Sequence, residues 1–426
     1  MKTEIKQLIE QIKNGEVPQG YKKTKIGIVP IEWKVKKLIN ICKTVGGGTP
    51  NTKNKHYWSG QIPWVSSSDI AENNIFDINI HRFITEQALN NSATKIVPKN
   101  SILLVSRVGV GKLAISSCDI CTSQDFTNLT EIKGNIYTIA YLVKVSIDLK
   151  LKMLQGTSIK GITSSEIKNL DVIYPSILEQ KKISEILSTQ DKVIELKEKL
   201  IEEKQKQKKY LMQNLLTGKI RLKSFTGEWK KYVMGNLGNT YSGLSGKNKD
   251  DFGKGKPYIP YTNIFLNPII DVNELGYVDV LENEKQSKVC YGDIFFTTSS
   301  ETPEEVGMSS VLLENVDELY LNSFCFGFRL NNFSVLSPIY ASHYFRGDTF
   351  RNILNRLAQG ATRFNLSKNN LLKSILLLPP LEEQKAIAEI LSTQDKEIKL
   401  LQKELEEEKQ KKKALMQLLL TGIVRV

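Results

Sequence analysis

The sequence predicts a mixed α/β (α+β) protein with a pseudo-two-fold internal repeat, in which two similar globular domains are separated by two long antiparallel coiled-coil helices. Three observations support this prediction. One segment occurs twice, as EQKKISEILSTQDK at 179–192 and as EQKAIAEILSTQDK at 383–396. Both copies continue with the residue spacing of a long helix. Elsewhere, short apolar runs typical of strands alternate with turn-rich segments.

The duplication extends beyond its most similar segment. At the same displacement of 204 residues, LMQ at 211–213 matches LMQ at 415–417, and the pair QG at 155–156 matches QG at 359–360. A period near 200 residues is far longer than the unit of a solenoid protein. We therefore interpret the repeat as two copies of a whole domain followed by a helix.

Each repeated segment begins a predicted coiled-coil helix. Proline stands just before each helix and glycine follows each one, as expected at helix ends. About 38 helical residues span on the order of 57 Å, which suits a spacer; an ordinary dimerisation coiled coil is the alternative. The predicted seam alternates steps of four and three over about five heptads. In the first helix it comprises Ile183, Leu187, Gln190, Ile194, Lys197, Ile201, Lys204, Lys208, Leu211 and Leu215. In the second helix it comprises Ile387, Leu391, Gln394, Ile398, Leu401, Leu405, Glu408, Lys412, Leu415 and Leu419.

The chain begins with a predicted amphipathic helix that carries Ile5, Leu8, Ile9 and Ile12 on one face. It either fills a place in a pseudo-symmetric ring or simply docks for packing. The predicted division of the chain is an N-terminal helix at 1–20, a first globular domain at 21–176, a central helix at 177–222, a second globular domain at 223–379 and a C-terminal helix at 380–426.

The two globular copies share a framework but differ in their loops. Buried strands are predicted at 102–105, 294–296 and 374–378. The polar loop SRVG at 106–109 corresponds to TSSE at 298–301. Loops on a rigid scaffold carry recognition, so the difference suggests two readers of different targets; neutral drift of surface loops is the alternative.

Composition points to a globular protein that attracts polyanions. The 426 residues are 40% hydrophobic and 25% charged, with a net charge of +13. An excess of lysine and arginine favours nucleic acid as a partner. No apolar run is long enough to span a membrane, no signal-peptide core is evident, and five scattered cysteines suit a reducing compartment. We expect a cytoplasmic protein with no membrane partner.

The search for catalytic motifs identifies none. The segment RVGVGK at 107–112 lacks the first glycine and the final Ser or Thr of a phosphate-binding loop. No N/D-P-P-Y/F motif for amine methylation is present. Cys118 and Cys121 form a lone C-x-x-C without further ligands at zinc-site spacing. We therefore expect no catalytic residue, no metal site and no cofactor in this chain.

Four segments resemble the DNA specificity subunit of Type I restriction-modification systems: GGTP at 47–50 followed by HYWSGQIPW at 56–64, then QGATR at 359–363, and LEEQKAIAEILS at 381–392. The resemblance implies two target recognition domains, each reading half of a split, asymmetric site in double-stranded DNA. It also implies two methylation subunits that bring S-adenosylmethionine, and optional restriction subunits that use ATP with Mg²⁺. The first copy reads QGTSI where the second has QGATR, so Arg363 has no counterpart there.

Polar and basic loop residues are the predicted DNA contacts, because such side chains bind base edges and phosphates. In the first domain they are Thr52, Lys53, Asn54, Lys55, Ser66, Ser67, Ser68, Arg107, Lys112 and Lys160. In the second they are Ser245, Lys247, Asn248, Lys249, Tyr261, Thr262, Asn263, Thr298, Ser299, Arg363 and Asn365.

Two other interpretations stay open at this point. The chain could be a coiled-coil scaffold without sequence-specific DNA reading. It could also be an enzyme with an unrecognised nuclease or methyltransferase site. Salt-sensitive DNA binding separates the first from a DNA reader, and DNA modification by the purified chain supplied only with Mg²⁺ or a methyl donor would reveal the second.

Overall fold

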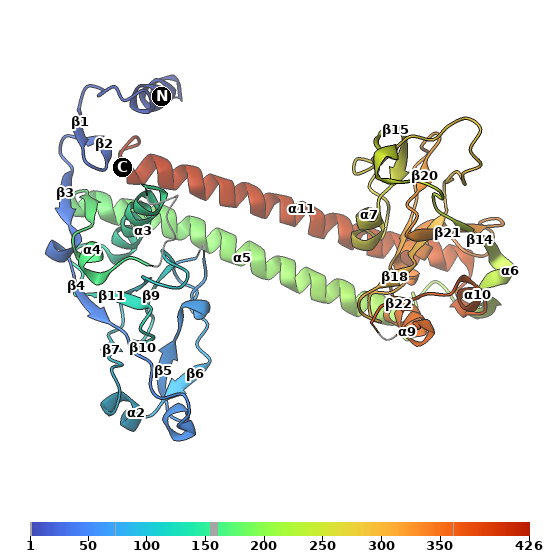
Figure 1. Cartoon of the computed structure of the whole chain (residues 1–426), viewed down its shortest axis with the longest axis horizontal. Coiled ribbons are helices and arrows are strands. Elements are labelled where there is room, and N and C mark those ends of the chain that lie inside the picture. Colours follow the sequence, from blue (N-terminus) through green and yellow to red (C-terminus); the bar gives the residue numbers. More distant parts are fainter. Residues whose placement is uncertain (1, 73, 154–160, 361) are drawn as a thin grey trace. The chain divides into compact units, whose positions relative to one another are not determined.

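The computed structural model describes residues 2–72, 74–153, 161–360 and 362–426, and shows two compact units. Unit 1 consists of residues 1–198 and 404–426, and unit 2 of residues 199–403. Each unit therefore combines a globular domain with parts of both long helices, α5 (Ile177–Leu215) and α11 (Leu381–Leu420) (Figure 1). The mixed α/β class and the two long helices are confirmed. None of the described helices combines the length and the apolar character needed to cross a membrane.

Unit 1 contains three sheet-and-helix layers. The sheet β4-β11-β8-β9 lies between the helix α3 and a second sheet of order β6-β5-β10-β7. A hairpin and a two-stranded ribbon, β1-β2 and β3-β12, complete the unit. The elements are α1 (Lys2–Lys13), β1 (Tyr21–Thr24), β2 (Gly27–Pro30), β3 (Lys34–Lys37), β4 (Lys43–Gly46), β5 (Ile62–Val65), β6 (Arg82–Ile84), α2 (Glu86–Asn90), β7 (Ile96–Val97), β8 (Ile102–Val105), β9 (Leu113–Ile115), β10 (Ile120–Thr122), β11 (Phe126–Thr130), α3 (Ile136–Met153), α4 (Ser164–Lys168) and β12 (Asp171–Tyr174).

Unit 2 repeats this layering. The sheet β14-β21-β17-β19 lies against α8 and α9 on one side, and the sheet β16-β15-β20 forms the next layer. The ribbons are β13-β23 and β18-β22. The elements are β13 (Lys230–Val233), α6 (Met234–Leu237), β14 (Gly238–Ser242), β15 (Phe252–Ile259), α7 (Tyr261–Leu266), β16 (Gly276–Val278), β17 (Ile294–Thr297), β18 (Ser299–Ser300), β19 (Ser309–Val311), β20 (Tyr320–Leu321), β21 (Cys325–Leu330), α8 (Pro338–Tyr344), α9 (Asp348–Leu357), β22 (Phe364–Asn365), α10 (Lys368–Leu372) and β23 (Ile375–Leu378).

The layering explains why some strands are apolar at every position. In β8, Ile102 and Leu104 pack in the core that contains α3, whereas Leu103 and Val105 pack against the second sheet. Successive side chains of a strand point to opposite faces, so a strand between two layers needs apolar residues on both. The strand β17 follows the same rule, with Ile294 turned toward the helices.

The prediction of a buried strand at 374–378 is only half correct. Leu376 and Leu378 are buried, but Ile375 and Leu377 are 55% and 39% exposed. The strand β23 pairs only with β13, and the described structure places no third layer over the outer face of that ribbon. A run of apolar residues therefore does not distinguish a strand covered on both faces from one covered on a single face.

Every residue of the predicted coiled-coil seam is buried or half-buried. Most polar members are paired across the two helices; the exception is Gln394, whose side-chain oxygen is buried without a hydrogen-bond partner among the described residues. In unit 1, Lys197 contacts Glu404 at 2.6 Å and the Gln190 amide donates to the Glu408 carboxylate at 2.7 Å. In unit 2, Lys204 contacts Glu397 at 2.6 Å. The partner's number falls as the α5 number rises, so the two helices are antiparallel, as predicted.

A buried glutamate lies in the first turn of each long helix. In unit 1 the Glu179 carboxylate accepts hydrogen bonds from the Trp33 indole at 2.9 Å and from the Arg425 guanidinium at 2.5 Å. Burial raises the pKa of Glu179, but these hydrogen bonds outweigh burial and hold the pKa below its usual value. Arg425 follows α11, so the end of one long helix completes the start of the other.

Unit 2 repeats the arrangement at the equivalent residues. Glu383 is fully buried, and the Arg221 guanidinium donates to both of its oxygens at 2.6 and 2.7 Å. The Trp229 indole adds a third hydrogen bond at 3.3 Å. Bidentate pairing of arginine with a carboxylate is among the strongest hydrogen-bond geometries in proteins.

We predict that Arg221→Met destabilises unit 2 by about 3 to 5 kcal/mol, because it leaves the charge of Glu383 buried and unpaired. Urea denaturation followed by circular dichroism measures the loss. The control is Lys206→Met, which removes exposed ion pairs with Glu202 and Glu203 and should change stability by less than about 1 kcal/mol. Equal losses in the two variants would contradict the prediction.

Candidate nucleic-acid interface

A short backbone segment gathers three candidate loops of unit 1. This hub segment, residues 122–125, accepts hydrogen bonds from the amides of Gly48 at 2.8 Å and Ser106 at 2.7 Å, and donates one to the carbonyl of Val65 at 2.9 Å. The loops that begin at these three positions contain nine of the ten residues predicted for this domain. Their grouping follows from strand pairing, since β10 and β5 are parallel neighbours and end at the same edge.

The hub segment of unit 2, residues 321–325, makes the same three kinds of hydrogen bond. It accepts from the amides of Leu244 at 2.7 Å and Thr298 at 3.0 Å, and donates to the carbonyl of Ile259 at 3.2 Å. The predicted residues of this domain lie in the loops after these positions and in residues 363–365, of which 364 and 365 pair with β18. The two copies therefore share one backbone arrangement for their loops.

Glycine permits the close approach of the first loop to each hub segment. A Cβ atom on Gly47 would lie 2.0 Å from the carbonyl oxygen of Ser123, and one on Gly243 would lie 2.1 Å from that of Asn322. Any other residue would force the backbones apart, so these positions need glycine for contact distance.

The loop at 51–58 of unit 1 has a locally fixed backbone and exposed cations. Thr52, Lys53 and Lys55 are exposed, whereas Asn54 is half-buried and accepts a hydrogen bond from the amide of His56 at 3.1 Å. Side-chain capping of this kind orders a turn without tertiary contacts. The free lysine side chains suit phosphate contacts.

The serine turn at 66–68 is held by a side chain that the sequence analysis missed. The Arg82 guanidinium donates to the Ser66 hydroxyl at 2.6 Å, pairs with buried Asp69, and lies 4.7 Å from the Trp64 ring centroid. Ser66 is therefore engaged inside the protein, and Ser68 presents the exposed side chain of the turn. Only the fold brings Arg82 to this turn, through pairing of β6 with β5.

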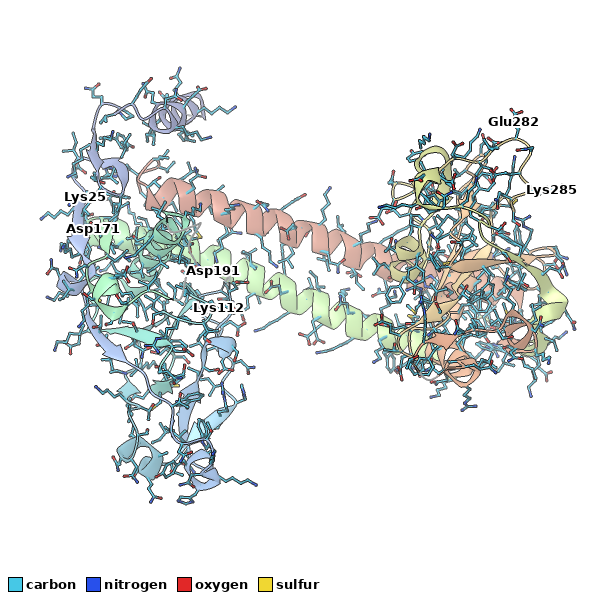
Figure 2. All side chains as sticks on the ribbon, in the orientation of Figure 1. Lys25, Lys112, Asp171, Asp191, Glu282 and Lys285 are labelled. Atoms are coloured by element: carbon cyan, nitrogen blue, oxygen red, sulfur yellow. The ribbon has the colours of Figure 1, made fainter. Side chains whose placement is uncertain are left out.

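The loop at 106–112 joins β8 to β9 and is followed by a strand, not by the helix of a phosphate-binding loop. Arg107 is exposed. Lys112, which is labelled in Figure 2, is half-buried. The amide of Ile162 donates to the Ser106 carbonyl at 2.8 Å, which places the segment after 160 beside this loop. Lys160 itself lies outside the described residues.

In unit 2, two predicted residues are used inside the protein. Asn263 is 1% exposed, and its amide donates to the carbonyls of Asp271 at 2.8 Å and Glu274 at 3.0 Å. Lys247 pairs with Glu284 at 2.6 Å, and its side chain is 6% exposed. Both side chains fix their loops, and neither presents a free polar group to a ligand.

Several of the other predicted residues of unit 2 lie together at β18 and β22. Arg363 donates to the Ser299 hydroxyl at 3.2 Å, and Asn365 pairs with Ser299 in the two-stranded ribbon. Tyr261 donates to the Ser299 carbonyl at 3.2 Å, and burial raises the pKa of its hydroxyl. The exposed members of the set are Ser245, Asn248, Lys249, Thr262, Arg363 and Asn365, and the half-buried ones are Tyr261, Thr298 and Ser299.

The hub segments add two exposed side chains that the sequence analysis missed. Gln124 is exposed in unit 1, and Phe324 is 60% exposed in unit 2. An amide can pair with adenine, and an apolar ring can contact the methyl group of thymine. No local sequence pattern marks these two positions, because strand pairing alone brings them between the loops.

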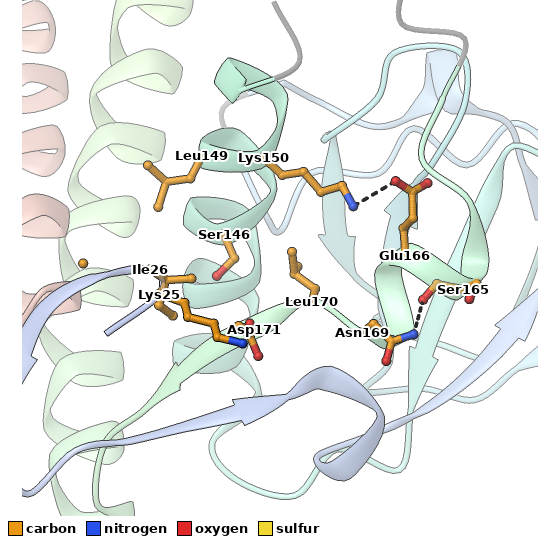
Figure 3. Close-up of a pocket in the computed structure, with 11 residues that line it drawn as sticks. Lys25, Ile26, Ser146, Leu149, Lys150, Ser165, Glu166, Asn169, Leu170 and Asp171 are labelled. Carbon is orange, nitrogen blue, oxygen red and sulfur yellow. Dashed lines mark hydrogen bonds and ion pairs between the residues drawn. The ribbon is translucent and has the colours of Figure 1, made fainter. Parts of the chain in front are cut away.

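A cavity of unit 1 lies away from these loops. It has a volume of about 540 Å³ and is lined by the tip of the β1-β2 hairpin, α3, α4 and β12 (Figure 3). Lys150 pairs with Glu166 at 3.0 Å at one side of it. Hydrogen bonds from the Thr163 backbone and from Lys150 lower the pKa of Glu166 to about 2. None of the lining residues is a predicted DNA contact.

Among the described residues, no group of three or more His, Cys, Asp or Glu side chains is placed to hold a metal ion.

A family model for the Type I restriction modification DNA specificity domain matches residues 30–205 and 227–410. The MjaVIII specificity subunit of a Type I restriction enzyme from Methanocaldococcus jannaschii is 27% identical over 425 residues, covering 93% of this chain and 94% of that relative. The MjaIX specificity subunit from the same organism is 36% identical over 183 residues, but this match spans only 42% of each chain.

Solved structures show the same fold. The S subunit of a Type-I restriction-modification system from M. genitalium aligns with a TM-score of 0.54 at 15% identity, covering 91% of this chain and 96% of that one. A chain from a structure describing complex assembly and conformational transition of the type I R-M system aligns with a TM-score of 0.59 at 15% identity, covering 93% and 99%. At such identities the likeness concerns the fold alone.

We predict that the double substitution Lys53→Ala, Lys55→Ala weakens binding to duplex DNA of any sequence. Loss of two phosphate contacts should also reduce the slope of log affinity against log salt by about one for each lysine. Fluorescence anisotropy across a salt series measures both quantities. The matched control is Lys13→Ala on α1, an exposed lysine outside the candidate loops. An unchanged salt slope in the double variant would place these lysines outside the interface.

Proposed function

Because the chain belongs to the Type I restriction modification DNA specificity family, we propose that it is the non-catalytic subunit that selects the DNA sequence for a Type I restriction-modification complex. Each unit reads one half of a split site through the loops gathered at its hub segment. The observation that carries this proposal is the repeated set of three hub hydrogen bonds combined with different exposed side chains. A shared scaffold with different contact residues suits a bipartite, asymmetric DNA site.

The catalytic steps are assigned to partner subunits. We expect two methylation subunits to supply S-adenosylmethionine and to methylate adenine, and restriction subunits, where they exist, to supply ATP-driven cleavage with Mg²⁺. The continuous helices α5 and α11, of 39 and 40 residues, are the elements that we assign to spacing the half-sites. We also assign part of the docking surface for partner subunits to these helices.

Single-molecule methylation sequencing tests the proposed function directly. DNA from cells that express this chain together with its methylation subunit is compared with DNA from cells that lack this chain alone. We expect a split, asymmetric methyladenine motif that disappears when the chain is absent. Methylation that persists unchanged without the chain would refute the proposal. If the intact complex showed no salt-sensitive DNA binding, the result would instead favour a scaffold that does not read DNA.

Shortening both long helices by one heptad tests the spacing function. Deleting 197–203 together with 398–404 removes Lys197 along with its partner Glu404, and retains the pair of Lys204 with Glu397. Seven helical residues correspond to roughly 10 Å, so we expect the gap between half-sites to shorten by up to about three base pairs at roughly 3.4 Å each.

The bases within each half should stay unchanged, because the deletion leaves both sets of loops intact. Methylation sequencing reads the gap and the bases from the same data. The control deletes 197–203 alone. This deletion shortens one helix without the other and breaks the register of the seam, so we expect it to abolish assembly of the complex. A variant with both deletions that keeps the original gap but prefers other bases would contradict the spacing function.

A further inference from the structure

Each unit carries a cationic side chain at an equivalent place behind its main sheet, on the helix α3 in unit 1 and in the turn directly after α8 in unit 2. Tyr141 of α3 bonds to Asp191, and His343 of α8 lies 3.8 Å from Asp395. Asp191 and Asp395 are equivalent residues of the repeat, so Tyr141 and His343 occupy equivalent positions. Three residues further on stand Lys144 in unit 1 and Arg346 in unit 2. Lys144 reaches the backbone of the loop at 106–112, and Arg346 reaches the backbone at the end of α7 and at the start of β19.

In unit 2, the guanidinium of Arg346 joins two recognition elements. It donates to the Ser309 carbonyl at 2.7 Å, and to three carbonyls at the end of α7, those of Ile264 at 2.7 Å, Phe265 at 3.0 Å and Asn267 at 2.9 Å. Burial lowers the pKa of Arg346 to about 10, so the group stays charged at neutral pH. The helix α7 begins with Tyr261 and Thr262, and Ser309 directly follows the loop at 298–308.

A second arginine fixes the same loop from α9. Arg351 donates to the carbonyls of Gly307 at 2.9 Å, Val306 at 2.8 Å and Glu304 at 2.5 Å. Val306 is fully buried in the core of unit 2. The end of the loop at 298–308 is therefore held both by packing and by charge-assisted hydrogen bonds, which are stronger than neutral ones.

These two arginines are unusual because their charge is paired with carbonyl groups alone. Within the described part of the chain, no carboxylate lies at ion-pair distance from Arg346 or Arg351. Both arginines are half-buried. Partial burial of a cation without a carboxylate partner is costly, and an apolar side chain of similar size would fill the space at lower cost. What the guanidinium groups provide instead is a fixed geometry for seven backbone carbonyls.

Unit 1 has a smaller version of the same device. The Lys144 ammonium donates to the Gly111 carbonyl at 3.0 Å and to Asp148 at 3.1 Å. The loop held here is 106–112, four residues shorter than the loop at 298–308 of unit 2. The cation of unit 1 binds one carbonyl of the shorter loop, whereas the two arginines of unit 2 bind seven carbonyls in and around the longer loop and α7. A longer segment loses more conformational entropy when it is ordered, so it needs more contacts to hold it.

We propose that Lys144 in unit 1, and Arg346 with Arg351 in unit 2, are positioning residues that set the sequence preference of their own half-site without touching DNA. The proposal rests on the proposed function, in which the loops at 106–112 and 298–308 contact DNA. Base readout requires donors and acceptors placed to within a few tenths of an ångström. A loop that loses its anchor keeps its side chains but presents them in several arrangements.

The test compares conservative variants with matched controls in the intact complex. Arg346→Lys and Arg351→Lys keep the charge but remove the planar set of donors. Arg356→Lys is the control, because Arg356 lies exposed on the same helix α9 as Arg351. In unit 1, Lys144→Met is compared with Lys152→Met, an exposed lysine of the same helix α3. Methylation sequencing gives the preference at every base of both half-sites.

We expect each unit 2 variant to reduce base discrimination at least tenfold in one half-site and to leave the other half unchanged. Lys144→Met should do the same in the opposite half-site, and the two controls should change neither. Lys144→Arg should keep discrimination, because it restores a cation at the Gly111 carbonyl. Thermal unfolding of each complex is measured in parallel.

Two results would overturn the inference. Discrimination unchanged in both halves would show that the anchors do not affect readout. Methylation that falls equally in both halves, in step with the melting temperature, would show a role in stability alone. Both are distinct from failure of the proposed function, in which the complex with the natural chain would itself show no split motif.

Discussion

The buried glutamate at the start of each long helix is the interaction on which each unit depends. Glu179 binds Trp33 from the opening of the globular domain and Arg425 from the far end of the chain. Glu383 binds the equivalent residues of unit 2, Trp229 and Arg221. A carboxylate buried this deeply requires its partners. Each unit therefore needs a domain, the start of one long helix and the end of the other. Unit 2 obtains all three from one continuous segment, residues 199–403, whereas unit 1 joins residues 1–198 to the distant segment 404–426.

The seam between the helices uses polar pairs where a simple coiled coil would use leucine. Lys197, Lys204 and Lys208 each meet a carboxylate of the opposite helix. Such pairs contribute little stability, but a shifted register would leave them unpaired. These polar residues therefore weaken the apolar contact between the helices but define their antiparallel register. For a spacer, a defined register matters more than maximal stability.

The repeat and the seam could be predicted from the sequence because both depend on residue spacing along the chain. Ile183 and Leu187, for example, are four residues apart and therefore lie on one face of a helix. The interface could be predicted only as a set of polar loops. Asn263 is as polar as Thr262, yet its amide serves Asp271 and Glu274 inside the unit. Phe324 lies between the loops only because β21 follows the hub segment into the sheet. Such long-range pairings leave no mark on the residues around them.

The two units also differ in the charge of the same loop, and this difference constrains how each can meet DNA. The loop at 106–112 carries Arg107 and Lys112, whereas the loop at 298–308 exposes Glu301, Glu304 and Glu305. Carboxylates are repelled by phosphates but accept hydrogen bonds from the amino group of cytosine. On the proposed function, the first loop can rest along the DNA backbone, while the second is tolerated only where it faces base edges. A loop restricted in this way needs firm anchorage, and it is the one that Arg346 and Arg351 hold.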